Sequence, residues 1–329
     1  MARTGGEGWN CRVGSWSGIP VTVHWTFFLL LLFQVAFGGI STKSGLYCLI
    51  LFLVYGPILF FIVLLHELGH AWRCRSYPGG SVGSIMLWPL GGFTDCHVEN
   101  GKCIQEFFIA LCGPLMHIPQ ILFWLLIMAV STNQGVSYFG SSLDTNALKN
   151  GGAGIFFAEM AKQALVLNIM LFALNILIPA YPLDGARLLA SFCGILGMDI
   201  TMIATIVFMA GAVIGLICLV MGIVFMVKGT SSGTLLLFLG IFALYTSGML
   251  YLSIKRAEHF THPLFQPDCY HGENREHNQQ VVSQAPVADS AVPRRQRKQR
   301  GKKTTDDNDE DVEMETKKPK QKTNLSSKT

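Results

Sequence analysis

The chain has 329 residues, of which 50% are hydrophobic, and a formal net charge of +4 at pH 7. Residues 1–254 hold ten of its 25 Lys and Arg residues between long apolar runs, whereas residues 255–329 hold the other 15. This division argues against a compact soluble domain, and because the charge belongs to no single surface we expect no nucleic acid partner.

Six apolar stretches have about the length that a membrane span requires, which is roughly 20 residues. The first is short and follows a weakly basic segment, so a cleaved signal peptide is an alternative, but no small-residue cleavage site follows it. We therefore expect an all-α polytopic membrane protein with a segment 1–22, a membrane domain 23–254 and a disordered charged tail 255–329. The six stretches cover about residues 23–40, 46–71, 103–130, 154–178, 201–227 and 234–254.

The Lys and Arg residues between the stretches predict how the chain is oriented, because cytosolic loops carry the excess of these residues. With the first segment in the cytosol, eight basic residues lie on the inner side and three on the outer side. Both termini are then cytosolic. The inner set is Arg3, Arg12, Arg73, Arg75, Lys102, Arg187, Lys255 and Arg256, and the outer set is Lys43, Lys149 and Lys228.

Residues 66–70 read His-Glu-Leu-Gly-His and end the second apolar stretch. Residues four apart share one face of a helix, so His66 and His70 can bind one zinc ion while Glu67 serves as a general base toward a water molecule there. Ionisable groups at membrane depth are costly and need a partner or a cavity. The alternative is polar decoration just outside the membrane.

A catalytic zinc site usually has three protein ligands, so one more must come from elsewhere in the chain. The best candidate is Asp184, which follows the fourth apolar stretch. Pro179 and Pro182 cannot continue a helix, and a broken helix at this depth is tolerated only beside protein or a wet cavity. Asp184 could instead cap a helix beginning near Ala186, and the residues alone leave both roles open.

Two further segments carry weaker signals. Residues 81–94 are apolar with glycine punctuation, which is typical of strands, and an exposed strand edge can bind an extended peptide; a plain surface hairpin is the alternative. The tail alternates basic and acidic blocks, with seven Lys and Arg residues in 294–303. Such blocks usually only solvate a disordered segment, but they are also candidates for binding anionic lipid or a cytosolic partner.

Taken together, these elements closely resemble the site-2 protease family of intramembrane zinc metalloproteases. The resemblance covers roughly residues 15–200. Within the family, the chain is similar to the compact six-span type without PDZ or CBS domains. It is carried by the metal motif, by the segment Pro179 to Arg187 (PAYPLDGAR), by Gly113-Pro114 with the preceding PLGGF segment, and by the lead-in GIPVTVHW at 18–25.

The resemblance implies a catalytic core of the second to fourth spans, within about residues 46–200. One zinc ion per chain would be bound by His66, His70 and Asp184, with Glu67 as the base. The substrates would be transmembrane proteins, cut in regulated intramembrane proteolysis after local unwinding. Asn175, Gly91 and Gly92 become candidates for contacts to the substrate or the oxyanion.

Three positions depart from the family pattern. Ile176 occupies the position where the family usually has an asparagine before the aspartate motif. Asn175 lies one residue earlier, which leaves the role of Asn175 open. Ala186 replaces the usual second glycine after the aspartate. His117 stands where many relatives have asparagine, three residues after the Gly-Pro proline, either as a polar neighbour of the site or as a packing residue.

Two other functions stay open at this point. One is a zinc-binding membrane adaptor that holds clients without cutting them, although binding alone does not need the base Glu67. The other is a transporter whose polar membrane residues line a path.

Overall fold

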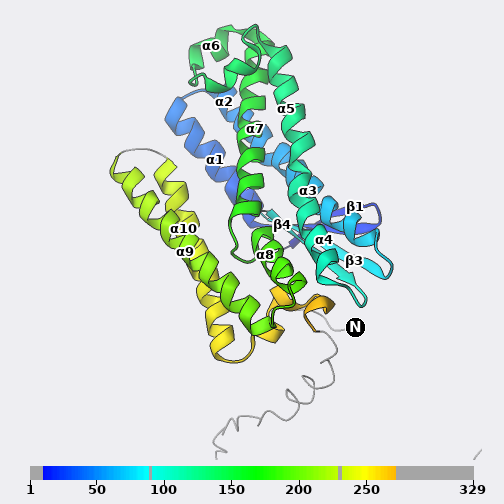
Figure 1. Ribbon diagram of the computed structural model, residues 1–329. Coiled ribbons are helices and arrows are strands. Elements are labelled where there is room, and N and C mark those ends of the chain that lie inside the picture. The colour runs from blue at the N-terminus through cyan, green and yellow to red at the C-terminus, as the bar shows by residue number, and fades with distance from the viewer. Residues whose placement is uncertain (1–9, 89–90, 229–231, 272–329) are drawn as a thin grey trace, which may run out of the picture. The chain divides into compact units, whose positions relative to one another are not determined.

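The computed structural model describes residues 10–88, 91–228 and 232–271 of the chain (Figure 1). The chain divides into a unit of Met1–Gln279 and a second of Gln280–Thr329, and all of the described residues lie in the first. The basic and acidic blocks of the tail, and Pro89 and Leu90 of the PLGGF segment, lie outside the described residues.

The described chain is mostly helical, as predicted. Five of the predicted stretches form helices long and apolar enough to cross a membrane: Gly45–Arg75, Cys103–Ser131, Gly152–Leu177, Ile200–Val227 and Leu236–Lys255. The first predicted stretch forms a shorter apolar helix of 17 residues. The helices are α1 (Thr26–Thr42), α2 (Gly45–Leu53), α3 (Leu59–Arg75), α4 (Cys103–Leu115), α5 (His117–Ser131), α6 (Thr145–Asn150), α7 (Gly152–Leu177), α8 (Asp184–Ile195), α9 (Ile200–Val227) and α10 (Ser232–Lys255).

Proline and glycine residues interrupt the helical chain at two places, between α2 and α3 and between α7 and α8. The π-helical turn Val54–Ile58 joins α2 to α3, and it contains Pro57 and the non-helical backbone of Gly56. α7 ends at Leu177, just before Pro179, so the predicted break is present. The chain then passes through a short loop and starts α8 at Asp184, which places that residue at a helix N-terminus.

A four-stranded sheet in the order β1-β2-β3-β4 lies beside α3 (Figure 1). β3 (Gly80–Trp88) and β4 (Gly91–Val98) form the antiparallel hairpin that the sequence indicated. β1 (Asn10–Trp16) and β2 (Ile19–His24) were not predicted, and β2 pairs with β3 in parallel. The N-terminal segment is therefore half of the sheet, and β4 is left as an edge strand.

The described chain extends beyond the predicted domain boundary at 254. Residues 259–271, here called the C-terminal segment, contain three 3₁₀ turns: His259–Thr261, Pro263–Phe265 and Asp268–Tyr270. Phe265 is fully buried in a cluster with residues of α8 and α9. The backbone N–H of Asn100 donates to Asp268, so the C-terminal segment is also fastened to the loop after β4.

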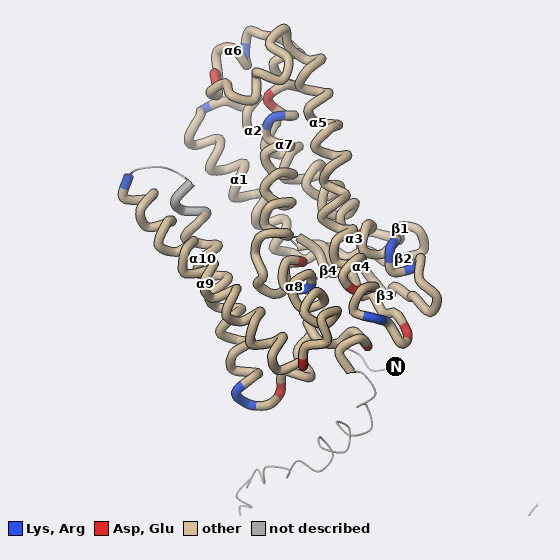
Figure 2. The backbone as a smooth tube through the Cα atoms, in the orientation of Figure 1, with Lys and Arg blue, Asp and Glu red and all other residues tan. Residues whose placement is uncertain are grey.

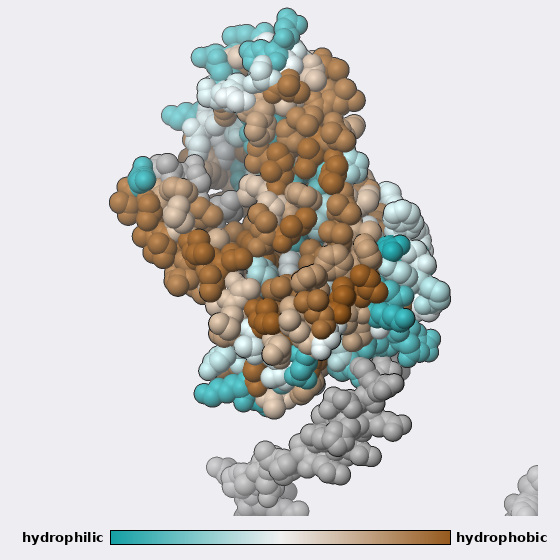
Figure 3. Space-filling view, viewed as in Figure 1, coloured by the Kyte–Doolittle hydropathy of each residue, from teal (hydrophilic) through white to brown (hydrophobic). Residues whose placement is uncertain are grey.

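Charge and hydropathy divide this unit into bands. Most charged residues gather near α6 or near the sheet and α8 (Figure 2), and the helix surfaces between them are largely apolar (Figure 3). Many large hydrophobic side chains on these helices are exposed, among them Phe37, Leu122 and Val220. An apolar belt between polar ends is the surface that a bilayer requires of a multi-pass protein.

The packing of Phe265 predicts that the C-terminal segment is part of the folded unit. Phe265→Ala leaves a cavity, and removing a buried phenylalanine costs about 3–5 kcal/mol. The variant in detergent should therefore melt at a clearly lower temperature than the wild type, whereas Phe238→Ala, on the exposed side of α10, should change it little. Equal melting of wild type and Phe265→Ala would contradict this packing.

Candidate metal centre

Three side chains of α3 are buried at one point of the structure. His66, Glu67 and His70 are 3%, 2% and 1% exposed, and their ligand atoms lie within 4.8 Å of one another. The spacing of four residues puts both imidazoles on one face of α3, as expected for a helix. Burial of three such polar groups demands strong partners.

The loop before α8 brings Asp184 to the two imidazoles. Its Oδ2 atom lies 2.9 Å from Nε2 of His66 and 3.2 Å from Nε2 of His70, and the two Nε2 atoms are 3.2 Å apart. Three ligand atoms bound tetrahedrally at 2.0–2.1 Å from a zinc ion would be about 3.3 Å from one another. The nitrogen, nitrogen and oxygen atoms therefore fit a zinc ion both in kind and in spacing.

Backbone and packing contacts orient His70. Its Nδ1 atom lies 2.7 Å from the carbonyl oxygen of Ile109 on α4, which can only accept a hydrogen bond. Nδ1 must therefore carry a proton, and in the neutral ring Nε2 is left with the lone pair. The imidazole of His70 fits beside α4 only because residue 113 is glycine, since a Cβ atom there would collide with the ring.

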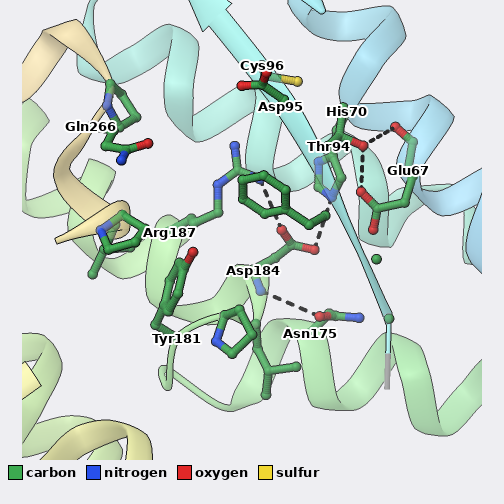
Figure 4. A pocket seen from close by; sticks show the side chains of 18 of the residues that line it. Glu67, His70, Thr94, Asp95, Cys96, Asn175, Tyr181, Asp184, Arg187 and Gln266 are labelled. Carbon is green, nitrogen blue, oxygen red and sulfur yellow. Dashed lines mark hydrogen bonds and ion pairs between the residues drawn. The ribbon is translucent and has the colours of Figure 1, made fainter. Parts of the chain in front are cut away.

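A second set of polar contacts holds Asp184. Its backbone N–H donates to Oδ1 of Asn175 at 3.5 Å, and Arg187 donates to its other carboxylate oxygen at 3.5 Å (Figure 4). Arg187 also forms a 2.8 Å ion pair with Glu106 on α4. Burial opposes ionisation of Asp184, but the facing imidazoles outweigh it and hold the pKa of that carboxyl below its usual value.

Glu67 faces the edge strand of the sheet. The hydroxyl of Thr94 on β4 donates to Oε2 of Glu67 at 2.6 Å, while Oε1 lies 3.9 Å from Nε2 of His66. Gly92 permits this approach, because a Cβ atom there would lie 2.6 Å from Oε1. The carboxylate is thus fixed on one side and stays beside the candidate metal position on the other.

These groups line a cavity whose walls come from distant parts of the chain. α3 and the first residue of α8 provide the candidate ligands, β4 provides Gly91 and Gly92, and the C-terminal segment provides Pro263 and Gln266 (Figure 4). Asn175, the third candidate for substrate contact, also lines it. The structure therefore gathers all seven residues that the sequence singled out around one cavity.

Sequence reasoning missed several neighbours of the site. Thr94, Glu106 and Gln266 carry no motif, and nothing in the chain signals their position. Arg187 offered a signal, since it lies three residues after Asp184 and so on the same face of a helix starting there. The alternation of β2, with Ile19, Val21 and Val23 buried, was also readable as a strand.

Comparison with known proteins gives consistent relatives. Residues 55–218 match the model of peptidase family M50. A zinc metalloprotease of Methanocaldococcus jannaschii is 30% identical over 184 residues, which are 55% of this chain and 44% of that protein. Stage IV sporulation protein FB of Bacillus subtilis is 24% identical over 181 residues, 54% of this chain and 49% of that protein. This chain thus spans less than half of the length of both relatives.

A solved structure is also similar, the site-2 protease from Methanocaldococcus jannaschii. It is 25% identical in sequence, and the match covers 73% of this chain and 94% of that one with a TM-score of 0.46.

The close approach of α4 to His70 predicts a sensitive glycine. Gly113→Ala puts a methyl group into the imidazole of His70, so the ring must move and the purified protein should hold much less zinc. Gly248→Ala, on α10 with open space around it, is the matched control and should keep the wild-type zinc content. Metal analysis of both proteins checks this, and equal zinc in the two would mean that His70 does not bind the ion.

Proposed function

We propose, from the premise that residues 55–218 of this chain belong to peptidase family M50, that the protein is a membrane-embedded zinc metalloendopeptidase. Its substrates are transmembrane segments of other proteins, cut in regulated intramembrane proteolysis. One observation carries the proposal. Two imidazole nitrogens and a carboxylate oxygen meet within 3.2 Å, next to a glutamate that is not needed as a ligand.

His66, His70 and Asp184 would hold one zinc ion per chain. When bound, zinc polarises the scissile carbonyl and stabilises negative charge on its oxygen. Arg187 does not take part as a ligand, since a guanidinium has no acceptor. Instead, its contacts to Asp184 and Glu106 keep the carboxylate aimed at the two histidines.

Glu67 acts as the general base in this proposal. It takes a proton from the attacking water and gives it to the leaving nitrogen of the cut peptide bond. Thr94 leaves one carboxylate oxygen free for this task, because its hydroxyl donates to the other one. The hydrogen bond also fixes the rotamer, so Glu67 is held in position before the substrate arrives.

The substrate binds as an extended strand along β4. This edge strand runs past Glu67, and an extended peptide can add to a free edge by backbone hydrogen bonds. Gly91 and Gly92 have no side chains that would keep the peptide from the base. Across the cavity, Gln266 offers its amide from the C-terminal segment, and Asn175 supports the Asp184 loop rather than the oxyanion.

We further propose that the sheet end of the protein faces the cytosol. Arg12 lies on β1, Arg75 ends α3 and Lys102 precedes α4, while Lys255 ends α10, which contacts the C-terminal segment. The predicted outer side carries fewer basic residues: Lys43 at the end of α1, Lys149 in α6 and Lys228 at the end of α9. In this proposed orientation the active site lies near the inner face and both chain termini are cytosolic, as the excess of basic residues on that side favours.

Replacing the base separates cleavage from metal binding. Glu67→Gln should reduce hydrolysis by at least 100-fold, on the order expected for loss of a general base, while its zinc content stays at the wild-type level. Glu99→Gln, at an exposed position after β4, should cut normally. Proteomics of membrane-protein fragments in cells with each variant provides the measurement.

Fragments that appear equally with wild type and Glu67→Gln would support an adaptor or a transporter instead.

Removing a ligand should act on the metal itself. His66→Ala and Asp184→Ala are each expected to lower the zinc content from about one ion per chain to well below half, because two remaining ligands bind weakly. Asp144→Ala, at the start of α6 near the opposite end of the unit, serves as the control and should keep its zinc. Unchanged zinc in both ligand variants would refute the assignment.

A further inference from the structure

His117 is a third buried histidine beside the candidate ligands. It starts α5 and is 1% exposed. Its Nε2 atom lies 3.1 Å from Nδ1 of His66, so it meets the side of that ring which faces away from Asp184. His117 therefore contacts a candidate ligand without itself facing the candidate metal position.

Asn168 on α7 determines which nitrogen of His117 carries the proton. Its amide nitrogen donates to the carbonyl oxygen of Ala164 at 3.1 Å, which leaves Oδ1 facing Nδ1 of His117 at 3.0 Å. An amide oxygen can only accept a hydrogen bond, so Nδ1 of His117 is the donor. The neutral ring then has its lone pair on Nε2.

The same reasoning continues to His66. Because Nε2 of His117 accepts, Nδ1 of His66 must donate to it. A neutral His66 protonated on Nδ1 has its lone pair on Nε2, the atom that faces Asp184 and His70. A chain of hydrogen bonds from Ala164 through Asn168 and His117 thus selects the tautomer that can bind a metal ion.

We propose that His117 is a positioning residue that, held by Asn168, keeps His66 oriented and in the tautomer that presents Nε2 to zinc. The proposal rests on the proposed function, since it assumes that His66 is a ligand. A plain packing role would not require both ring nitrogens to meet side chains from two other helices. Nor would it require Nδ1 of His117 to donate to Asn168 while Nε2 accepts from His66, which is the pattern that leaves Nε2 of His66 with its lone pair.

This role accounts for the departure from the family pattern at residue 117. A carboxamide and a neutral imidazole share one property, because each offers an acceptor and a donor to different neighbours. An asparagine or glutamine there could accept from His66 with its oxygen and donate to Asn168 with its nitrogen. The histidine therefore preserves the hydrogen-bond pattern while the side chain changes.

The test measures zinc affinity of the purified protein in detergent by competition with a zinc chelator dye. His117→Leu removes both hydrogen bonds and should weaken zinc binding about 10- to 100-fold, the usual effect of losing such a partner. His117→Gln keeps an acceptor and a donor and should regain most of the affinity. Gln120→Leu, which removes a mostly buried amide one turn further along α5, is the matched control and should bind like wild type.

A second pair of variants covers the case in which His117→Leu does not fold. Asn168→Leu removes the acceptor and should weaken zinc binding, whereas Asn168→Asp retains an acceptor oxygen and should bind more tightly than Asn168→Leu. Wild-type affinity in a folded His117→Leu or Asn168→Leu protein would overturn the inference and leave the proposed function intact. Wild-type protein that binds no zinc would instead refute the proposed function.

Discussion

The structure depends on three ligand-type atoms that are held close together on buried side chains. Nε2 of His66, Nε2 of His70 and Oδ2 of Asp184 all lie within 3.2 Å, and lone pairs on such atoms repel unless a proton or a cation lies between them. The fold has to supply the force that keeps them there. It does so because α4, α5 and α8 each contribute a contact that fixes one of these side chains, while α7 holds His117 through Asn168 and the backbone of Asp184 through Asn175.

Charge balance sets the second requirement. Asp184, Glu67 and Glu106 are buried within the same region, and an uncompensated carboxylate there would cost several kcal/mol. Arg187 balances Glu106 by a 2.8 Å ion pair and reaches Asp184 with the same guanidinium, and the pKa of Arg187 is raised because these carboxylates outweigh the cost of its burial. The remaining carboxylate, Glu67, has a neutral donor in Thr94. A positive ion among His66, His70 and Asp184 would complete the balance.

The sequence predicted the parts of this arrangement that are local. The apolar stretches indicated the helices, the His66–His70 spacing indicated one face of α3, and Pro179 and Pro182 indicated the break before Asp184. Contacts between distant segments could not be predicted, because they depend on packing. Thr94 contacts Glu67 only because the β3–β4 hairpin packs against α3. Residues 259–271 resemble a polar tail in sequence, and only the packing of Phe265 with residues of α8 and α9 shows that they belong to the folded unit. The averaged polarity of residues 255–329 concealed that short apolar run.

The position of the sheet bears on how a helical substrate could be cut at all. Unwinding a transmembrane helix exposes backbone N–H and C=O groups, and each unpaired group costs several kcal/mol in hydrocarbon. On the proposed function, an edge strand beside Glu67 would supply partners for those groups at the point where they are released. β4 occupies that place because β2 and β3 pair in parallel and direct the hairpin along α3. On the proposed function, the unpredicted N-terminal strands therefore serve catalysis indirectly, since they hold the edge on which an unwound substrate can be stabilised.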